Sequence, residues 1–364
     1  MKGLSRRFDA WVSHAPYTSA DLSIFRVLFA LLTLLTFPSI DFVSEYPRSL
    51  FDPPWGPFDW LSGPPGPRGL LVLELLTIAS LIALMVGLLT PLASIATGVG
   101  LIVCGGLSFS YGKTDHTILL AVVPLVLCWS SWGTRYSADA LRRKKTVLTS
   151  VGAVWPLRLL ALCIGVAFAT SGIEKVRGGW LELERQSAQW HMLRKFFFDD
   201  NAGPLAPVGS TIEFVPLWEA IDWLTVLLEL LILAAVLNWR AFRLALAVAT
   251  LFHLLVALLI GISFSANVIA YGAFVAWYGL AQLAGRGSLQ WTNRVPRRLA
   301  LGILVLAIPV VTTIWGWARE PLQQAIPAIS LAVVIFGSLI GSGYLVASSR
   351  EAWRPQPGRS RTSS

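Results

Sequence analysis

Charged residues are scarce in this chain. Only 13% of its 364 residues are aspartate, glutamate, lysine or arginine, about half the share of an ordinary soluble domain, whereas 55% are hydrophobic. A fold surrounded by water could not bury that much apolar surface. The composition therefore excludes a soluble globular protein and indicates an integral membrane protein.

Cysteine is also rare. Cys104, Cys128 and Cys163 each fall in an apolar stretch, and their spacing matches neither a disulfide framework nor a set of metal ligands. We therefore expect no metal site. The first residues include two arginines, but no long apolar core and no small-residue cleavage pattern follow them, so we expect no removable signal peptide.

The alternation of polar and apolar residues that marks barrel strands is missing, and long unbroken apolar runs stand in its place. A helix needs about 20 mainly apolar residues to cross the hydrocarbon core of a bilayer. The sequence thus predicts an all-α, polytopic transmembrane helical bundle with ten spans. These are residues 20–37, 70–89, 91–110, 116–132, 153–174, 217–237, 241–260, 263–284, 298–317 and 326–347.

The distribution of basic residues predicts the orientation. With ten spans and a cytoplasmic N-terminus, the inside segments hold twice as many lysines and arginines as the outside segments. Both termini are therefore expected in the cytoplasm, in a multi-pass protein of the cell membrane. The net charge of +9 is explained by this orientation and by contact with anionic lipids of the bilayer, so no nucleic-acid partner is expected.

Two segments outside the predicted spans are long. Residues 38–69 are rich in proline and include Phe51, Trp55, Phe58 and Trp60, which suggests a segment folded over the outer membrane surface. Residues 175–216 contain a stretch that fits an amphipathic interfacial helix. A Gly337–Gly341 pair on the last span permits close helix packing, most simply within the chain.

Ionisable groups at membrane depth are costly and are functional candidates by default. Some here have simple structural explanations. Arg26 and Arg158 are expected to reach towards the cytoplasmic interface, and Glu74, Glu219 and Asp222 lie near enough to the outer surface to reach water.

Four residues have no such explanation: Lys175, His116, Glu229 and His253. If their helices pack together, they form a polar pocket that opens outwards. Burial disfavours an ammonium ion, so a lysine in such a pocket could act as a general base. An alternative stays open, in which Lys175 pairs with Glu174 or Glu229 and His253 only forms a hydrogen bond between helices.

The same residues lie in motifs that resemble the HTTM-domain family, the membrane proteins that include vitamin K-dependent γ-carboxylase. The run from Phe168 to Trp180 resembles the family's glycine-x-x-lysine and tryptophan signature, with Gly172 and Lys175 in place. The likeness covers roughly residues 20–285. Further motifs follow in the family's order, at Ser23–Arg26, Asp115–His116, Tyr136–Asp139, Leu228–Glu229 and Phe252–His253.

The resemblance implies a division of the chain and a chemistry. It gives a cytoplasmic tail at 1–19, an HTTM-like domain of about eight spans at 20–285, an extra transmembrane pair at 286–347 and a basic cytoplasmic tail at 348–364. In the carboxylase, the lysine at the position of Lys175 is taken as the base that deprotonates reduced vitamin K. Thr134 and Leu183 replace a histidine and a glycine of the family pattern, and the carboxylase's large soluble region has no counterpart, so glutamate carboxylation itself is not expected.

Two hypotheses follow. The first is a membrane enzyme that uses a reduced quinone or similar lipid-soluble reductant, with Lys175 as base and with His116, Glu229 and His253 positioning the substrate. The second is a non-catalytic membrane factor for the maturation or export of a secreted peptide or partner protein, which docks on segments 38–69 and 175–216. A transporter is disfavoured because the sequence has no evident inverted repeat.

Overall fold

The computed structural model describes residues 9–53, 58, 60–112, 117–142, 154–199, 202–283 and 297–353. Every α-helix and 3-10 helix discussed below lies in these ranges, and no strand occurs in them. The α-helices are α2 (Ser19–Thr36), α3 (Pro67–Val86), α4 (Thr90–Phe109), α5 (Ile118–Leu127), α6 (Ala138–Arg142), α7 (Trp155–Arg177), α8 (Ser187–Phe198), α9 (Ala206–Gly209), α10 (Val215–Ala235), α11 (Trp239–Ile260), α12 (Ser265–Tyr271), α13 (Trp277–Leu283) and α14 (Arg297–Trp353).

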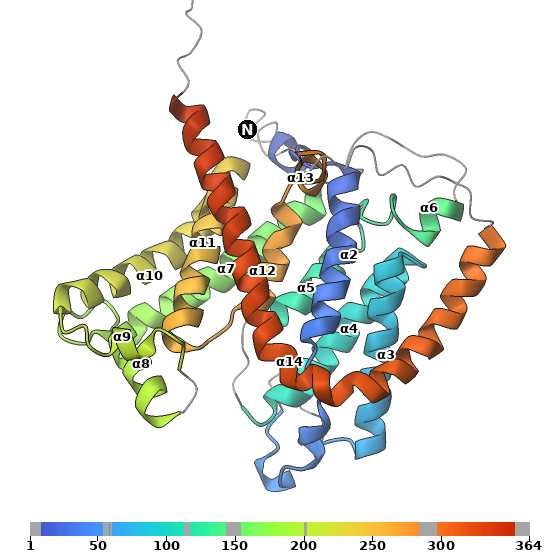
Figure 1. Cartoon of the computed structure of the whole chain (residues 1–364), viewed down its shortest axis with the longest axis horizontal. Coiled ribbons are helices and arrows are strands. Elements are labelled where there is room, and N and C mark those ends of the chain that lie inside the picture. Colours follow the sequence, from blue (N-terminus) through green and yellow to red (C-terminus); the bar gives the residue numbers. More distant parts are fainter. Residues whose placement is uncertain are drawn as a thin grey trace, which may run out of the picture.

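The long apolar helices form a bundle (Figure 1). Within the described residues, six helices are long and apolar enough to cross a membrane, namely α2, α3, α4, α7, α11 and the part of α14 at Ala318–Arg350. This confirms an all-helical, multi-pass membrane protein. The count of ten spans and the cytoplasmic termini stay predictions.

The helix ends follow local sequence signals. At the start of α2, the Thr18 hydroxyl accepts a hydrogen bond from the Asp21 N–H, and the Asp21 carboxylate accepts one from the Thr18 N–H in return. At the start of α11, the Asn238 side-chain oxygen accepts hydrogen bonds from the Arg240 and Ala241 N–H groups. Gly261, with φ +78°, ends α11 because a left-handed residue there closes the last turn.

Two predicted spans differ from the structure. The helix in the predicted span 116–132 is only the ten-residue α5, which contains Pro124 and ends at Leu127. The predicted single span 263–284 was wrong, because it is broken into α12, the 3-10 turn η3 (Gly272–Phe274) and α13, with Val275 extended. The Gly272 carbonyl accepts hydrogen bonds from the Val275 N–H at 3.3 Å and from the Trp277 indole N–H at 2.7 Å, so this backbone oxygen is satisfied at the break.

The predicted pair at 298–317 and 326–347 is continuous in its helical backbone. Figure 1 shows α14 running down one side of the bundle, bending at the bottom and returning upwards along its centre. Pro321 falls between the two predicted spans and Pro327 at the start of the second, and a proline inside a helix removes a hydrogen bond and promotes a kink. The two arms still run in opposite directions, as a transmembrane pair would.

The returning arm of α14 packs closely on α11. A Cβ atom on Gly341 would lie 2.6 Å from the Thr250 hydroxyl, and one on Gly337 would lie 2.3 Å from Val268. The Ser338 hydroxyl also donates to the Thr250 carbonyl at 2.9 Å. The glycine pair therefore serves contact within the chain, as predicted.

The described residues of the two long segments outside the predicted spans pack in part against the bundle. In segment 38–69, Phe58 is buried and covers Gly106, whereas Trp60 is 77% exposed; Trp55 lies outside the described residues. Segment 175–216 contains the predicted helix as α8, which buries Met192 against the bundle and exposes Phe198.

Candidate functional site

Helices α7 and α10 pack closely around Gly172. A Cβ atom at this position would lie 3.2 Å from the Glu229 Cβ and 3.1 Å from the Leu230 side chain. A larger residue would push the two helices apart. The glycine of the Gly172-x-x-Lys175 motif thus allows α10 to bring Glu229 next to the last turns of α7.

Lys175 and Glu229 form an ion pair at this approach. The Lys175 Nζ lies 2.7 Å from Glu229 Oε1 and 2.8 Å from Oε2, and it also donates to the Ser171 hydroxyl at 2.8 Å. The Ser171 hydroxyl lies 3.3 Å from Glu229 Oε1. An ammonium group has three N–H donors, and these three acceptors can satisfy all of them. The lysine is therefore fixed in one position.

The pair lies at the end of α7, where the bundle meets segment 175–216. The Lys175 side chain is 21% exposed and that of Glu229 is 7% exposed, so one edge of the pair is open and the rest is buried. The Trp180 ring lies 5.4 Å from Nζ, and it stacks on His191 of α8. A substrate could reach the lysine from this open edge.

His253 lies deeper in the bundle, in an aromatic layer. Its Nε2 and the Tyr271 hydroxyl share a hydrogen bond of 2.9 Å, and its ring stacks on Phe264 with centroids 4.6 Å apart. It also faces Phe168 of α7 at 6.0 Å. Phe168 precedes Lys175 by seven residues, roughly 10 Å along the helix. His253 thus joins α11 to α12 about two turns below the ion pair.

The structure therefore brings two of the four predicted residues into direct contact. Lys175 and Glu229 are in contact. His253 contacts Phe168 of α7, the helix that carries Lys175. His116 lies outside the described residues. Neither the general base nor a positioning role for these residues is tested by this geometry, but the ion pair that the sequence left as an alternative is present.

Two residues of the site were missed from the sequence. Ser171 lies four residues before Lys175, on the same face of α7, so the helical period was a usable signal. Tyr271 sits in an apolar run, and its signal was weaker: a buried phenol hydroxyl requires a hydrogen-bond partner.

The other acidic residues differ from their predicted surroundings. Glu74, Glu219 and Asp222 do not reach water but are buried. Asp222 accepts hydrogen bonds from the backbone N–H groups of Ser187 and Ala188 and so fixes the start of α8. Their burial has a structural cause, because each carboxylate is bonded to a segment of the outer layer.

Arg26 and Arg158 are also buried rather than extended towards an interface. Arg158 donates to the Trp11 and Val236 carbonyls at 2.8 and 3.0 Å, and its guanidinium lies 3.6 Å from the centre of the Trp239 ring. Arg26 donates to the Tyr136 carbonyl. These arginines tie the N-terminal segment and the loop after α5 to the bundle.

The chemistry available at the site is that of a lysine and a carboxylate. No cluster of three or more potential metal ligands occurs in the part of the chain that the structure describes. A buried amine beside a carboxylate can accept, hold and release a proton.

Comparison with known proteins gives one match. The family model of the HTTM domain matches residues 14–274, well over half of the chain, and this range contains Lys175, Glu229 and His253. Helices α13 and α14 lie beyond it. Neither a curated protein nor a solved structure matches the chain significantly. The extent of the family match leads to one conclusion: this multi-pass membrane protein belongs to the HTTM-domain family.

Proposed function

We propose that this protein is an enzyme of the cell membrane that removes a proton from a lipid-soluble quinol, with Lys175 as the base. One observation carries the proposal. Lys175, in the family's lysine position, is held at a partly open edge by Glu229 and Ser171, with an aromatic ring beside it. A flat aromatic quinol fits next to Trp180, and its hydroxyl could approach Nζ.

The ion pair supplies a route to a neutral amine. Transfer of one proton from the Lys175 ammonium to Glu229 leaves an amine and a carboxylic acid 2.7 Å apart. Glu229 therefore acts on Lys175 and not on the substrate, and Ser171 keeps Nζ in place as the proton moves.

His253 and His116 take secondary roles in this proposal. His253 holds α11 and α12 together through Tyr271, so it shapes the inner wall behind the ion pair. His116 is proposed to position the substrate, on the strength of its place in the family motif alone.

The test is quinol consumption by the purified protein in lipid nanodiscs. We expect oxygen to oxidise a reduced naphthoquinone to the quinone, taking up its two electrons and two protons as hydrogen peroxide. The Lys175→Ala and Lys175→Arg variants should lose at least about 100-fold in rate, the scale of general base catalysis. Lys195→Ala is the matched control, because Lys195 pairs with Asp199 on the more exposed α8. Full activity of both Lys175 variants would refute the proposal.

A second candidate function is that of a non-catalytic maturation factor, and exposed aromatic side chains favour it. Trp60, Trp190, Phe197 and Phe198 are all largely exposed on the two outer segments, and such side chains could dock a secreted peptide. If the protein is a maturation factor, replacing these aromatic residues with serine should impair function in cells more than Lys175→Ala does. The opposite ranking favours the enzyme.

A further inference from the structure

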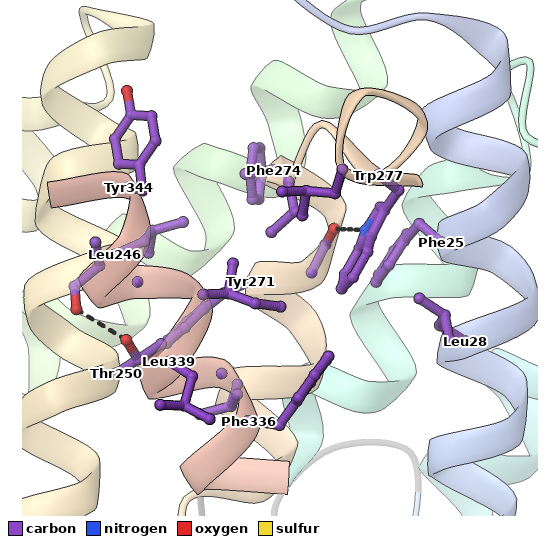
Figure 2. Close-up of a pocket in the computed structure, with 18 of the residues that line it drawn as sticks. Phe25, Leu28, Leu246, Thr250, Tyr271, Phe274, Trp277, Phe336, Leu339 and Tyr344 are labelled. Atoms are coloured by element: carbon purple, nitrogen blue, oxygen red, sulfur yellow. Dashed lines mark hydrogen bonds between the residues drawn. The ribbon is translucent and has the colours of Figure 1, made fainter. Parts of the chain in front are cut away.

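A large cavity lies on the side of the bundle formed by α2, α11, α12, α13 and α14. Its volume is about 1200 Å³, at the upper end of the roughly 300–1,000 Å³ typical of small-molecule pockets. Figure 2 shows Phe25 and Leu28 of α2 facing Leu339 and Phe336 of α14 across it. Neither Lys175 nor Glu229 is among the residues that line it.

The walls are almost entirely apolar, and the cavity opens on the surface of the bundle. Phe336 and Leu339 line it and are 58% and 65% exposed. On α14 the lining extends from Ile329 to Ala347, roughly 27 Å of helix, whereas one leaflet of hydrocarbon is about 15 Å deep. An acyl chain could therefore enter from the bilayer and lie along the full length of the cavity.

The break between α12 and α13 belongs to this cavity. Tyr271, Gly272, Phe274 and Trp277 all line it. Non-helical backbone at membrane depth is tolerated where it is buried in protein or lines a cavity, and here the Gly272 carbonyl accepts from both the Val275 N–H and the Trp277 indole N–H. The helices on either side of the break, α12 and α13, therefore both line the cavity.

One end of the cavity carries a positive charge. Arg243, one turn into α11, lines the cavity with its guanidinium 5.2 Å from the Tyr344 ring and 6.0 Å from the Tyr17 ring. Its Nε is buried without a hydrogen-bond partner, and no carboxylate of the described ranges forms an ion pair with it. A guanidinium in such surroundings calls for an anion.

We propose that this cavity is the binding site of an anionic glycerophospholipid, with its phosphate at Arg243 and an acyl chain along α14. A planar guanidinium matches phosphate geometry and can bind two phosphate oxygens at once. The tyrosine rings beside it suit the headgroup level of a membrane. The site is independent of the chemistry proposed at Lys175, and its α14 wall lies beyond the HTTM match.

The orientation predicted from the sequence agrees with this lipid. Arg243 lies at the end of α11 that was expected in the cytoplasm, and anionic lipids are enriched in the cytoplasmic leaflet. A neutral quinone would fill the apolar part of the cavity but would leave the guanidinium without an anion. The charge at Arg243 therefore decides between the two ligands.

Native mass spectrometry of the full-length protein tests the site. The protein is reconstituted with phosphatidylglycerol or with phosphatidylcholine carrying identical oleoyl chains, then released into the gas phase. We expect one phosphatidylglycerol to be retained and phosphatidylcholine to be lost. Arg243→Gln should weaken retention about tenfold, as expected for one charge-assisted hydrogen bond. Arg350→Gln, a change of an exposed arginine at the same end of the molecule, should leave retention unchanged.

A second variant, Gly343→Leu, tests the same site independently, in case Arg243→Gln fails to fold. Gly343 lines the cavity, and a Cβ atom added there meets no atom within 4 Å. Gly343→Leu should therefore fill the cavity and displace the lipid without disturbing the packing of the helices. Equal retention of the two lipids, or retention that neither Arg243→Gln nor Gly343→Leu reduces, would overturn the proposal. So would a dimer or a quinone occupying the cavity in place of the phospholipid.

Discussion

At the scale of single residues, Glu229 is the residue that holds Lys175 in place at the candidate site. Its carboxylate contacts both the Lys175 ammonium and the Ser171 hydroxyl, and it lies on α10, which packs closely on α7 at Gly172. These contacts make the ion pair a structural element, and in the proposed function it is also the source of reactivity. Its two roles can be separated by mutation.

Removal of one partner should destabilise the protein more than removal of both. In Glu229→Leu the Lys175 charge is left without a counterion, and we expect the free energy of unfolding to fall by roughly 3 kcal/mol, because Lys175 is only partly solvated. The double variant Lys175→Met with Glu229→Leu should recover part of this loss. Equilibrium unfolding in detergent micelles measures both; a double variant less stable than Glu229→Leu would contradict this account.

Gly172 should be intolerant of a side chain. Gly172→Leu places atoms against Glu229 and Leu230, and overpacking of this kind costs about 1–3 kcal/mol. Gly112→Leu is the matched control, because a Cβ atom there meets nothing within 4 Å. Thermal unfolding of the two variants gives the comparison, and equal midpoints would show that α7 and α10 do not need this close approach.

At the scale of elements, α14 is attached to the family domain by a charged contact at its bend. Arg319 contacts Glu74 at 2.8 Å and Asp41 at 2.6 Å, and the Gln323 amide donates to the Phe37 carbonyl. Glu74 is 1% exposed and also accepts from the Ile40 N–H. The bend of α14 is thus bonded to α3 and to the segment that follows α2.

Arg319→Met should loosen this attachment. It leaves Glu74 buried with a weaker set of partners, and we expect a loss of roughly 3–5 kcal/mol of stability. Arg177→Met is the control, since its ion pair with Glu174 is largely exposed and contributes little. Protease sensitivity of α14 and thermal unfolding report the difference; similar behaviour of the two variants would refute the role of Arg319.

The sequence predicted helices better than it predicted their contacts. Apolar runs placed α2, α3, α4, α7, α10 and α11 within a few residues, because a membrane span requires a continuous apolar stretch. The break at Gly272 was missed because every neighbouring residue is compatible with a span, and contacts that stabilise it, such as the Trp277 hydrogen bond, form only in the folded chain. Glu74 was assigned to the surface because its partner Arg319 lies far away in the sequence.

At the candidate site, too, the residues could be predicted from the sequence but their contacts could not. Lys175 and Glu229 could be selected from their cost in a membrane and from the family motif. Their pairing could not be settled, because it depends on the distance between α7 and α10, to which the glycines of α7, Gly165 and Gly172, contribute. Tyr271 was missed for the same reason, since its partner His253 belongs to another helix.

At the scale of the whole molecule, the orientation in the membrane can be tested by labelling. Figure 1 places the end of α14 and the start of α2 on one side of the bundle and the segment before α3 on the other. In a Cys163→Ala background, with Cys104 and Cys128 buried, a membrane-impermeant maleimide should label Trp60→Cys in intact cells and Ser349→Cys only after lysis. The reverse pattern would contradict cytoplasmic termini.

The central claim is that a lipid-soluble quinol occupies the site at Lys175. Native mass spectrometry of the protein purified in its own lipids tests it most directly, because a quinone and a phospholipid differ in mass. The account predicts that wild-type protein and Lys195→Ala retain a quinone, and that Lys175→Ala loses it while remaining folded. A quinone retained equally by Lys175→Ala, or found in none of the three proteins, would contradict the account.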